Sequence, residues 1–345
     1  MVKAFGLDLT NAARLKQIYD GSGIDDRYSV IPDFAFDGVE QNTFFGRSHN
    51  LEPFPGTQQR LQIYQQYAAD IATQAAKKCF EAFDNDIAQN ITHIITVSCT
   101  GMYAPGIDID LVERLGLNRQ TERTCINFMG CYGAINALKT ADYICRADTT
   151  AKVLVVSVEL CTLHFQKENT LDNWVANSLF SDGAAAVLVE NEANRSNKGP
   201  SLLLDNFYSE FIPEASNDMG WYVGNYGFEM KLTSKVSKHV KRNIKPLTER
   251  VLQKAGLSFD QIDAFAIHPG GRSILEATEE ALEITPAANK LAYETLQEYG
   301  NMSSATILFV LKKILNSDME AGKKILSFAF GPGLTVEGMI LKTGK

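Results

Sequence analysis

Apolar and polar residues alternate along the chain with two different periods, which indicates an α/β protein. Short, continuous apolar runs rich in valine and isoleucine predict strands buried on both faces, at residues 91–97, 152–158 and 184–189. Amphipathic segments between them predict helices at residues 11–19, 58–83 and 108–115. The longest of these helices carries an apolar stripe that consists of Leu61, Tyr64, Ala68, Ile71, Ala75 and Cys79.

The second half of the chain repeats the order of elements in the first half. It predicts a helix at 237–255 and strands at 262–267, 324–330 and 334–341. Cys131 and Asn301 each stand where an apolar helix opens, and 170 residues separate them. This self-similarity indicates two related βα units, at 1–195 and 196–345, which meet in a polar linker at 191–200. A coincidental α/β order is the alternative.

Composition and charge narrow the classes of function. The chain has 345 residues, of which 45% are hydrophobic, and its net charge of −8 argues against a nucleic-acid surface. No apolar run approaches the ~18 residues that span a membrane. Residues 1–8 lack a signal-peptide core, so we expect a cytoplasmic protein. Six cysteines without a Cys-x-x-Cys pair indicate neither a metal site nor a disulfide framework.

One cysteine lies in a setting that favours chemistry. Cys131 stands in the run Gly130–Cys131–Tyr132–Gly133, immediately before an apolar helical segment at 135–144. Glycine permits a sharp turn and the close approach of a ligand. The unpaired N–H groups and the dipole at a helix N-terminus favour a thiolate. Cys131 is therefore a candidate nucleophile, and the alternative is a small side chain packed in the core.

Two further residues meet Cys131 if a pseudo-twofold axis relates the halves. His268 ends a strand and is followed by a proline and two glycines. Open α/β sheets place ligands at such carboxyl ends of strands. Asn301 occupies the helix start that corresponds to Cys131. We interpret both as candidate catalytic residues; the alternatives are a structural histidine and a helix-capping asparagine.

The motifs around these residues resemble those of the type III polyketide synthases, the chalcone synthase-like enzymes, in what looks like their bacterial branch. The resemblance rests on Gly130–Gly133, Ala266–Gly271, Tyr299–Ala305 and Phe330–Glu337. It implies the thiolase fold with an αβαβα layered core, and a homodimer. It also implies that an acyl-CoA starter is extended iteratively by decarboxylative Claisen condensation with malonyl-CoA. CoA thioesters are then the substrates, with no bound cofactor and no metal.

The same resemblance implies roles for the three candidate residues. Cys131 is expected to accept the acyl group as a thiolate, which His268 holds as an imidazolium–thiolate pair. His268 and Asn301 are then expected to donate hydrogen bonds to the malonyl thioester during decarboxylation.

Other positions follow from the resemblance as parts of a substrate cavity. Phe180 corresponds to a phenylalanine that gates this cavity. Met230 stands where plant enzymes have a second gate phenylalanine, and Phe228 is the alternative occupant of that place. Further cavity positions are Cys99, Thr100, His164, Trp221 and Ser303. Because this chamber differs from that of plant chalcone synthases, we expect a pyrone, resorcinol or phloroglucinol-type product.

The resemblance also implies a binding site for CoA. The expected residues are Arg14, Lys16, Gly270, Gly271 and Arg272. Because this set holds fewer cations than the family usually has, an acyl carrier protein is kept open as the donor of the starter. Two other functions also stay open: a ketoacyl-acyl-carrier-protein synthase that makes a single condensation, and a non-catalytic partner subunit.

Overall fold

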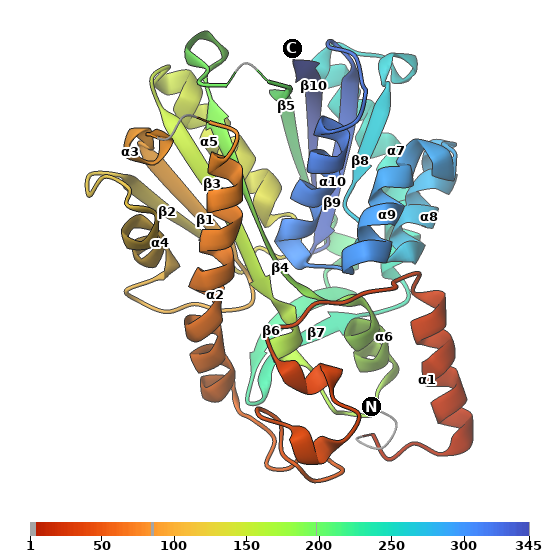
Figure 1. The fold of residues 1–345 in the computed structure, drawn as a ribbon. Coiled ribbons are helices and arrows are strands. Elements are labelled where there is room, and N and C mark those ends of the chain that lie inside the picture. Colours follow the sequence, from red (N-terminus) through yellow and green to blue (C-terminus); the bar gives the residue numbers. More distant parts are fainter. Residues whose placement is uncertain (1–4, 84–85, 198, 345) are drawn as a thin grey trace.

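A computed structural model describes residues 5–83, 86–197 and 199–344. The first four residues, which belong to the N-terminal stretch discussed above, and Lys198 of the expected linker lie outside these ranges. Two four-stranded sheets stand side by side, and helices lie between them and on both outer faces (Figure 1). The protein thus has the αβαβα layers that the sequence led us to expect.

The first sheet contains β1 (His93–Ser98), β2 (Glu122–Asn127), β3 (Lys152–Leu160) and β4 (Asp182–Glu190). Its order is β2–β1–β3–β4, and β3 runs parallel to β1 and antiparallel to β4. The two central strands are almost wholly buried because helices cover both faces, which explains their continuous apolar runs. β2 forms the edge of the sheet and is mostly exposed.

The second sheet contains β5 (Ser201–Phe211), β8 (Ala264–Ile267), β9 (Lys324–Gly331) and β10 (Thr335–Gly344). Its order is β5–β10–β9–β8, and β9 runs parallel to β8 and antiparallel to β10. This arrangement repeats that of β1, β3 and β4 in the first sheet. The internal repeat that the sequence indicates is therefore present in the topology.

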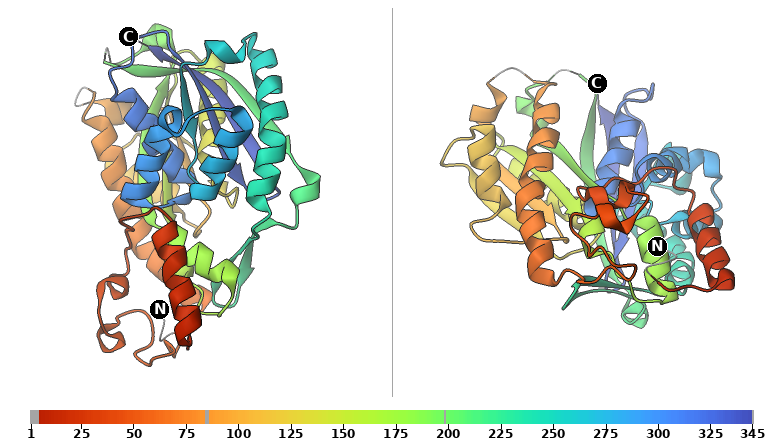
Figure 2. Two further views of the ribbon diagram at one scale, coloured as in Figure 1. Left: turned by 90° about the vertical axis from the view of Figure 1, so that its right-hand side faces the viewer. Right: turned by 60° about the horizontal axis from the view of Figure 1, so that its bottom comes forward.

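Helices complete the layers around the two sheets. The central layer consists of α5 (Gly133–Ala147) and α10 (Thr306–Leu315), each of which packs against strands of both sheets. The outer face of the first sheet is covered by α2 (Thr57–Phe80), with α4 (Ile107–Leu115) beside it. On the side of the second sheet lie α7 (Val236–Ala255), α8 (Arg272–Leu282) and α9 (Lys290–Tyr299) (Figures 1 and 2). The short helix α3 (Ile87–Asn90) precedes β1.

A smaller set of elements covers one end of the sandwich, at the bottom of Figure 1. It consists of α1 (Leu9–Gly21), α6 (Leu171–Leu179) and a hairpin made of β6 (Met219–Gly224) and β7 (Gly227–Leu232). α1 packs against α6, and the hairpin packs against α6 and α2. These elements form walls of the cavity described below.

The buried face of α2 differs from the predicted stripe. Of the six predicted residues only Tyr64 and Ala68 are fully buried, whereas Leu61 and Ile71 are half-buried. The face against the sheet consists of Arg60, Tyr64, Ala68, Ala69, Ala72, Thr73 and Ala76. Its small side chains let the helix lie close to the strands, so the larger apolar residues flank the contact instead of filling it.

Several elements were not predicted from the sequence, namely β2, β5, β6, β7, α8 and α9. They lie at edges or on the surface, where polar side chains or, in β6, glycines interrupt the apolar pattern. The second apolar helix also begins later than expected, because a 3₁₀ turn at Ser303–Ala305 separates Asn301 from α10.

Candidate active site

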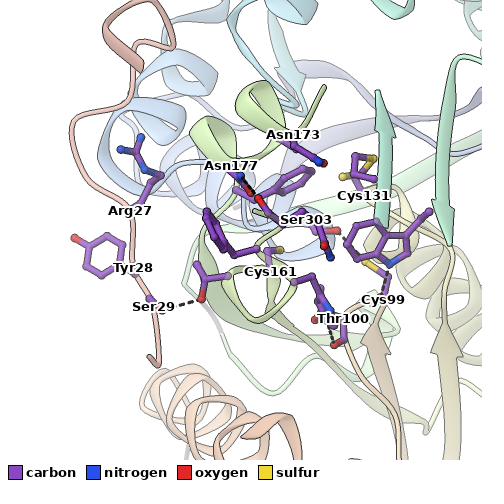
Figure 3. A pocket seen from close by; sticks show the side chains of 18 of the residues that line it. Arg27, Tyr28, Ser29, Cys99, Thr100, Cys131, Cys161, Asn173, Asn177 and Ser303 are labelled. Carbon is purple, nitrogen blue, oxygen red and sulfur yellow. Dashed lines mark hydrogen bonds between the residues drawn. The ribbon is translucent and has the colours of Figure 1, made fainter. Parts of the chain in front are cut away.

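A cavity of about 350 Å³ opens at the end of the sandwich that α6 and the β6–β7 hairpin cover (Figure 3). Its outer part is bordered by the exposed aromatic side chains of Tyr28 and Phe34, which keep 51% and 41% of their surface exposed. Its inner part reaches Thr100, Cys131 and Ser303, which are buried. The cavity therefore connects the surface with the candidate nucleophile.

The turn that carries Cys131 requires its two glycines. Gly130 has a φ of +80°, and a Cβ atom there would lie 2.4 Å from Pro332 Cδ. A Cβ atom at Gly133, the first residue of α5, would lie 2.8 Å from Val97 Cγ1. Cys131 is thus held between β1 of the first sheet and the β9–β10 turn of the second, two residues before α5 begins.

Burial decides the protonation state of Cys131. Loss of water raises the pKa of the Cys131 thiol to about 12, although hydrogen bonds with Ser303 and Asn301 act to lower it. The helix N-terminus that we expected to favour a thiolate does not outweigh this cost. Without a ligand, Cys131 is therefore a neutral thiol.

Asn301 is fixed by hydrogen bonds from both its backbone and its side chain. Its N–H donates to Leu179 O at 2.9 Å, and its carbonyl accepts from Ser181 N at 3.0 Å. Its Nδ2 donates to Gly270 O at 3.1 Å, and its Oδ1 accepts from Ser303 N at 2.8 Å. Since α10 begins only at residue 306, Asn301 orders the turn before the helix and does not occupy the N-cap position.

His268 follows β8 and is buried, with 1% of its surface exposed. Its backbone N–H donates to Phe328 O at 2.7 Å, which continues the pairing of β8 with β9. Within the described residues neither ring nitrogen has a hydrogen-bond partner. Burial lowers the pKa of His268 to about 3, so its imidazole is neutral, which does not favour the expected imidazolium–thiolate pair in the free protein.

His268 and Asn301 approach each other through Gly270. Asn301 bonds to the carbonyl of Gly270, and a Cβ atom at Gly270 would lie 3.6 Å from His268 Cδ2. Neither His268 nor Asn301 is among the residues that line the cavity, whereas Cys131 is. The structure thus joins Asn301 to the His268 loop by a hydrogen bond, and the Asn301 side chain acts to lower the pKa of Cys131.

A buried glutamate that the sequence analysis missed lies beside the candidate nucleophile. Glu159 in β3 is fully buried, and burial raises the pKa of its carboxyl group although its hydrogen bonds lower it. Its donors are the Cys99 N–H and S–H groups and the hydroxyl groups of Ser98, Thr100 and Ser304. The sequence did contain a signal for Glu159, because it directly follows the apolar run at 152–158. An acidic residue in such a strand is rarely buried without a specific role.

His164 joins two parts of the cavity wall by hydrogen bonds. Its Nδ1 accepts a hydrogen bond from Phe228 N at 2.9 Å, so its Nε2 carries the proton and donates to Thr100 O at 2.7 Å. The imidazole also stacks on the Phe228 ring, with 4.3 Å between centroids. Burial lowers the pKa of His164 to about 3, so this side chain is neutral and both nitrogens are engaged.

The β6–β7 hairpin supplies the neighbouring part of the wall. Trp221 and Met230 are paired across the hairpin, and both line the cavity. Trp221 Nε1 donates to Cys99 O at 2.8 Å, and its ring meets the edge of His164. Phe228 is 2% exposed and does not line the cavity, so of these two residues only Met230 borders the space.

The remaining expected cavity positions also border this space. Phe180, directly after α6, lines the cavity and forms an isolated β-bridge with Asn301. Cys99, Thr100 and Ser303 line its inner part. Cys161, which the sequence analysis did not select, is a further lining residue (Figure 3).

None of the residues expected to bind CoA lines the cavity. Lys16 pairs with Asp20 at 2.6 Å, and Arg272 pairs with Glu276 at 2.8 Å. These two pairs lie on the surface, and Arg14 is exposed as well. The cations expected at the cavity are thus held by acidic neighbours on their own helices or stand away from its lining.

A different cation lies at the mouth of the cavity. Arg27 lines it, donates to Ser178 O at 3.1 Å and places its guanidinium group 5.0 Å from the centre of the Tyr19 ring. Gly271 precedes the first residue of α8, so this helix begins next to the Gly270 loop. The sequence analysis missed Arg27 because it occurs in an irregular segment without a spacing signal.

In the part of the chain that the structure describes, no cluster of three histidine, cysteine or acidic side chains is arranged to hold a metal ion. Over the same residues, every helix is too short or too polar to cross a membrane.

Comparison with known proteins identifies the family. Residues 11–193 match the family model of the N-terminal domain of chalcone and stilbene synthases, and residues 204–344 match that of the C-terminal domain. An α-pyrone synthesis polyketide synthase-like protein, Pks18 of Mycobacterium tuberculosis, is 30% identical over 341 residues, which cover 97% of this chain and 83% of the relative. Type III polyketide synthase A of Arabidopsis thaliana is 31% identical over 300 residues, 85% of this chain and 75% of the relative.

Solved structures agree with this assignment. The type III polyketide synthase domain of Steely1 from Dictyostelium superposes with a TM-score of 0.90 at 29% identity, covering 98% of this chain and 92% of that chain. The 1,3,6,8-tetrahydroxynaphthalene synthase of Streptomyces coelicolor gives a TM-score of 0.86 at 26% identity, covering 98% and 91%. Since these relatives come from bacteria, a plant and an amoeba, the expected bacterial branch stays a prediction.

The fold is therefore the thiolase fold of polyketide synthases, as expected, and the chain belongs to the chalcone and stilbene synthase family. It is a type III polyketide synthase: a malonyl-CoA-dependent acyltransferase that extends acyl-CoA substrates by iterative condensation. Its substrates are CoA thioesters, and its reaction uses no separate cofactor.

Proposed function

We propose that Cys131 accepts the starter and that His268 and Asn301 activate malonyl-CoA. The Cys131 sulfur attacks the thioester carbonyl, the bond to CoA breaks, and the acyl group stays on Cys131. Malonyl-CoA then loses CO₂, and its carbonyl oxygen becomes an enolate oxygen. The enolate carbon attacks the acyl thioester on Cys131, which leaves as a thiolate, and the longer chain is loaded for the next round.

The unpaired groups of His268 and the position of Asn301 support this division of roles. His268 is buried and neutral, so one of its nitrogens is an N–H donor without a partner among the described residues. Asn301 uses one Nδ2 hydrogen on Gly270 O, and the second, which acts on the Cys131 sulfur in the free protein, can turn to a ligand beside it. Donors fixed in a water-poor site stabilise a developing oxyanion strongly. The observation that carries the proposal is that Asn301 holds the backbone of Ser303, which lines the inner part of the cavity together with Cys131.

The cavity wall supports a small or aliphatic starter and a short polyketide. Trp221 is held by Cys99 and His164 by two backbone groups, so neither bulky ring is free to move aside. Met230 leaves a flexible side chain at the second gate position, and Phe180 forms the first gate. We infer a pyrone, resorcinol or phloroglucinol-type product.

Incubation with malonyl-CoA and a panel of acyl-CoA starters, followed by mass analysis of the products, tests this function. We expect at least one starter to yield products heavier by several two-carbon units. A product with only one added unit, formed only with acyl carrier protein, would instead support the single-condensation synthase. Lack of condensation with every starter would support a non-catalytic partner subunit.

We also propose that Arg27 and the start of α8 receive the anionic part of CoA at the mouth of the cavity. Arg27 lines the cavity, and the first residue of α8 is Arg272. A helix N-terminus and a guanidinium group both favour phosphate. Asp25 and Asp26 also line the mouth and repel phosphate, so a carrier protein stays open as the donor of the starter.

A homodimer is proposed from the exposed edge of the first sheet. Among the residues that the structure describes, β2 pairs with β1 alone, so its outer edge faces no other described strand. Met102 and Met129, near the end of β2, keep 45% and 37% of their surface exposed. A second copy that pairs along β2 would cover these side chains.

We further propose that the two halves of the chain divide near residue 195. A cytoplasmic location stays a prediction.

A further inference from the structure

The β6–β7 hairpin has one side toward the cavity and an outer side. Trp221 and Met230 line the cavity. Because side chains alternate along a strand, their neighbours Tyr222 and Lys231 point to the opposite side. A Cβ atom at Gly220 would lie 2.5 Å from Tyr222 Oη, so the Tyr222 ring lies over this glycine. Gly220 pairs directly with Lys231, which places an aromatic ring beside an exposed cation on the outer side.

The tip of this hairpin exposes aromatic and apolar surface. Residues 219–228 contain no charged side chain. Tyr222, Val223 and Tyr226 keep 53%, 64% and 51% of their surface exposed. Among the described residues, no other stretch of five contains three large exposed hydrophobic side chains. Single exposed apolar residues are ordinary, whereas a cluster of them marks a surface that contacts a partner.

Exposed cations continue this outer side onto α7. Three residues separate the end of β7 from the start of α7, so the two elements are adjacent. Lys235, Lys238 and Arg242 are all exposed, and their spacing of i, i+3 and i+7 puts them on one face of the helix. Together with Lys231 they form a group of four cations, which we call the basic face.

Nearby acidic side chains do not neutralise the basic face. Its four cations form no ion pair with the acidic side chains that the structure describes, whereas Lys241 and Lys245 of the same helix do. Asp218, at the base of the hairpin, is bonded to a threonine and a histidine instead. Between residues 219 and 242 the sequence holds one acidic residue, Glu229, against five lysines and arginines. Positive charge therefore prevails on this side of the molecule.

Cations at this end of a helix do not contribute to its stability. The helix dipole places partial positive charge at the N-terminus, and α7 has no acidic residue in its first turn. Lys235, the N-cap residue, and Lys238 therefore add to the repulsion there. In a chain whose net charge is −8, such a local group of unpaired cations creates a positive field that attracts an anionic partner.

We propose that the hairpin tip and the basic face together bind the surface of an anionic lipid bilayer. The exposed tyrosine rings suit the headgroup region because one end of each ring is apolar and the other carries a hydroxyl group. The cations of the basic face lie beside the tip, where they can meet the phosphate groups of the lipids. A partner bound by charge alone, such as an acidic protein or a nucleic acid, would leave the uncharged tip unexplained. Binding at a membrane surface requires no helix that crosses the bilayer.

Flotation of the full chain with lipid vesicles tests this surface. Vesicles of phosphatidylcholine alone are compared with vesicles of equal parts phosphatidylcholine and phosphatidylglycerol, each at low and at high salt. We expect binding to the anionic vesicles at low salt. Binding should be at least about tenfold weaker to the neutral vesicles and at high salt, since salt screens the attraction. A protein that stays unbound in all four mixtures would overturn the proposal.

Two double variants separate the two parts of the surface. Lys235→Glu with Lys238→Glu should weaken binding to anionic vesicles at least about tenfold, because two attractive charges become repulsive. Val223→Ser with Tyr226→Ser should weaken it roughly tenfold at unchanged charge, because less apolar surface enters the headgroup region. Full binding by the second variant would show a surface that acts by charge alone, as toward an acidic protein, and would contradict the proposal.

Lys77→Glu with Lys78→Glu is the matched control, because it changes the net charge by the same amount. Both lysines are exposed in the last turn of α2, whose first residue bonds to Asn225 in the hairpin turn. This length of helix puts them about 30 Å from that residue. We expect the control to bind as the wild type does, and an equal loss in the control would refute a specific role for the basic face. Because flotation needs no substrate, its outcome does not depend on the proposed function.

Discussion

Burial and hydrogen bonding determine the chemical state of Cys131, His268 and Asn301. Burial raises the pKa of Cys131 to about 12 and lowers that of His268 to about 3, so both are neutral in the free protein. A neutral His268 with an unpaired N–H suits an oxyanion donor better than a resident cation. The side chain of Asn301 donates to Gly270 O and accepts from Ser303 N and from the Thr306 hydroxyl group, which fixes the direction of its amide.

Removal of either donor is predicted to impair decarboxylation. His268→Ala and Asn301→Asp should each slow the release of CO₂ from malonyl-CoA on the order of 10²–10³-fold, because one donor to the enolate oxygen is lost. Release of CO₂ from labelled malonyl-CoA measures this rate. His239→Ala serves as a control, because His239 pairs with Asp218 and does not line the cavity. Decarboxylation at the wild-type rate in both variants would refute the assignment.

Stability is predicted to fall in mild acid because of the two buried histidines. The pKa of His164 and that of His268 are lowered from 6.5 to about 3 in the folded protein. Below pH 6.5 the unfolded chain gains protons that the folded protein does not, so the free energy of unfolding decreases as the pH falls toward 3. Each histidine contributes a slope of up to about 1.4 kcal/mol per pH unit.

Urea unfolding at pH 7, 6 and 5 tests this prediction. His164→Gln should give a shallower dependence on pH than the wild type, whatever its absolute stability, because one of the two groups is removed. Equal slopes for the two proteins would show that His164 does not stay neutral in the folded state.

The sequence predicted the residues with a motif and missed those without one. Cys131, His268 and Asn301 stand at glycine-rich turns or element ends, which local patterns reveal. Glu159 and Arg27 have no such setting, since one lies in a strand and the other in an irregular loop. Their importance comes from neighbours distant in the sequence, such as Cys99 beside Glu159, and only the folded chain brings these together.

At the level of elements, the β6–β7 hairpin and the 3₁₀ turn Cys161–His164 set the shape of the cavity. His164 joins this turn to β7 and to the loop after β1 by two hydrogen bonds. Trp221 joins β6 to the same loop. Hydrogen bonds thus link the elements of the cavity wall to one another. A change in one of these side chains should therefore alter the space available to the growing polyketide.

Trp221→Ala is predicted to lengthen the product by at least one two-carbon unit, because a large ring leaves the wall. Tyr222→Ala is the matched control: it is the next residue in β6, points to the opposite face and is 53% exposed. Mass analysis of the products formed from one starter measures the number of two-carbon units added. The same product distribution in wild type and Trp221→Ala would contradict this role.

The sequence predicted the buried strands more accurately than the edge strands. β1, β3 and β4 were predicted within two residues, because strands covered on both faces have continuous apolar runs. β2 is almost wholly exposed, β6 contains two glycines and exposed aromatic and aliphatic residues, and β7 mixes buried residues with charged ones, so no clear period marks these strands. The position of an element in the sheet therefore decided whether its sequence revealed it.

At the level of the whole molecule, residues from both halves meet at one site. Cys131 belongs to the first half, whereas Asn301, Ser303 and His268 belong to the second. The β9–β10 turn supplies Pro332, which packs against Gly130. The internal repeat was visible in the sequence, but the meeting of the halves depends on the packing of α5 and α10 between two sheets.

A short bismaleimide cross-linker is predicted to join two copies of the protein through Cys125. This thiol is exposed near the middle of β2, where a second copy would pair. Denaturing gels should show a covalent dimer for the wild type and none for Cys125→Ser. Light scattering should give twice the chain mass for both proteins. A monomer in solution would rule out pairing along β2.

The most direct test of the central claim is the intact mass of the protein after incubation with an acyl-CoA starter that supports product formation. Our account predicts an added mass equal to the acyl group in the wild type, carried by the peptide that contains Cys131. It predicts no added mass in Cys131→Ala. An acyl adduct that persists in Cys131→Ala would contradict the account.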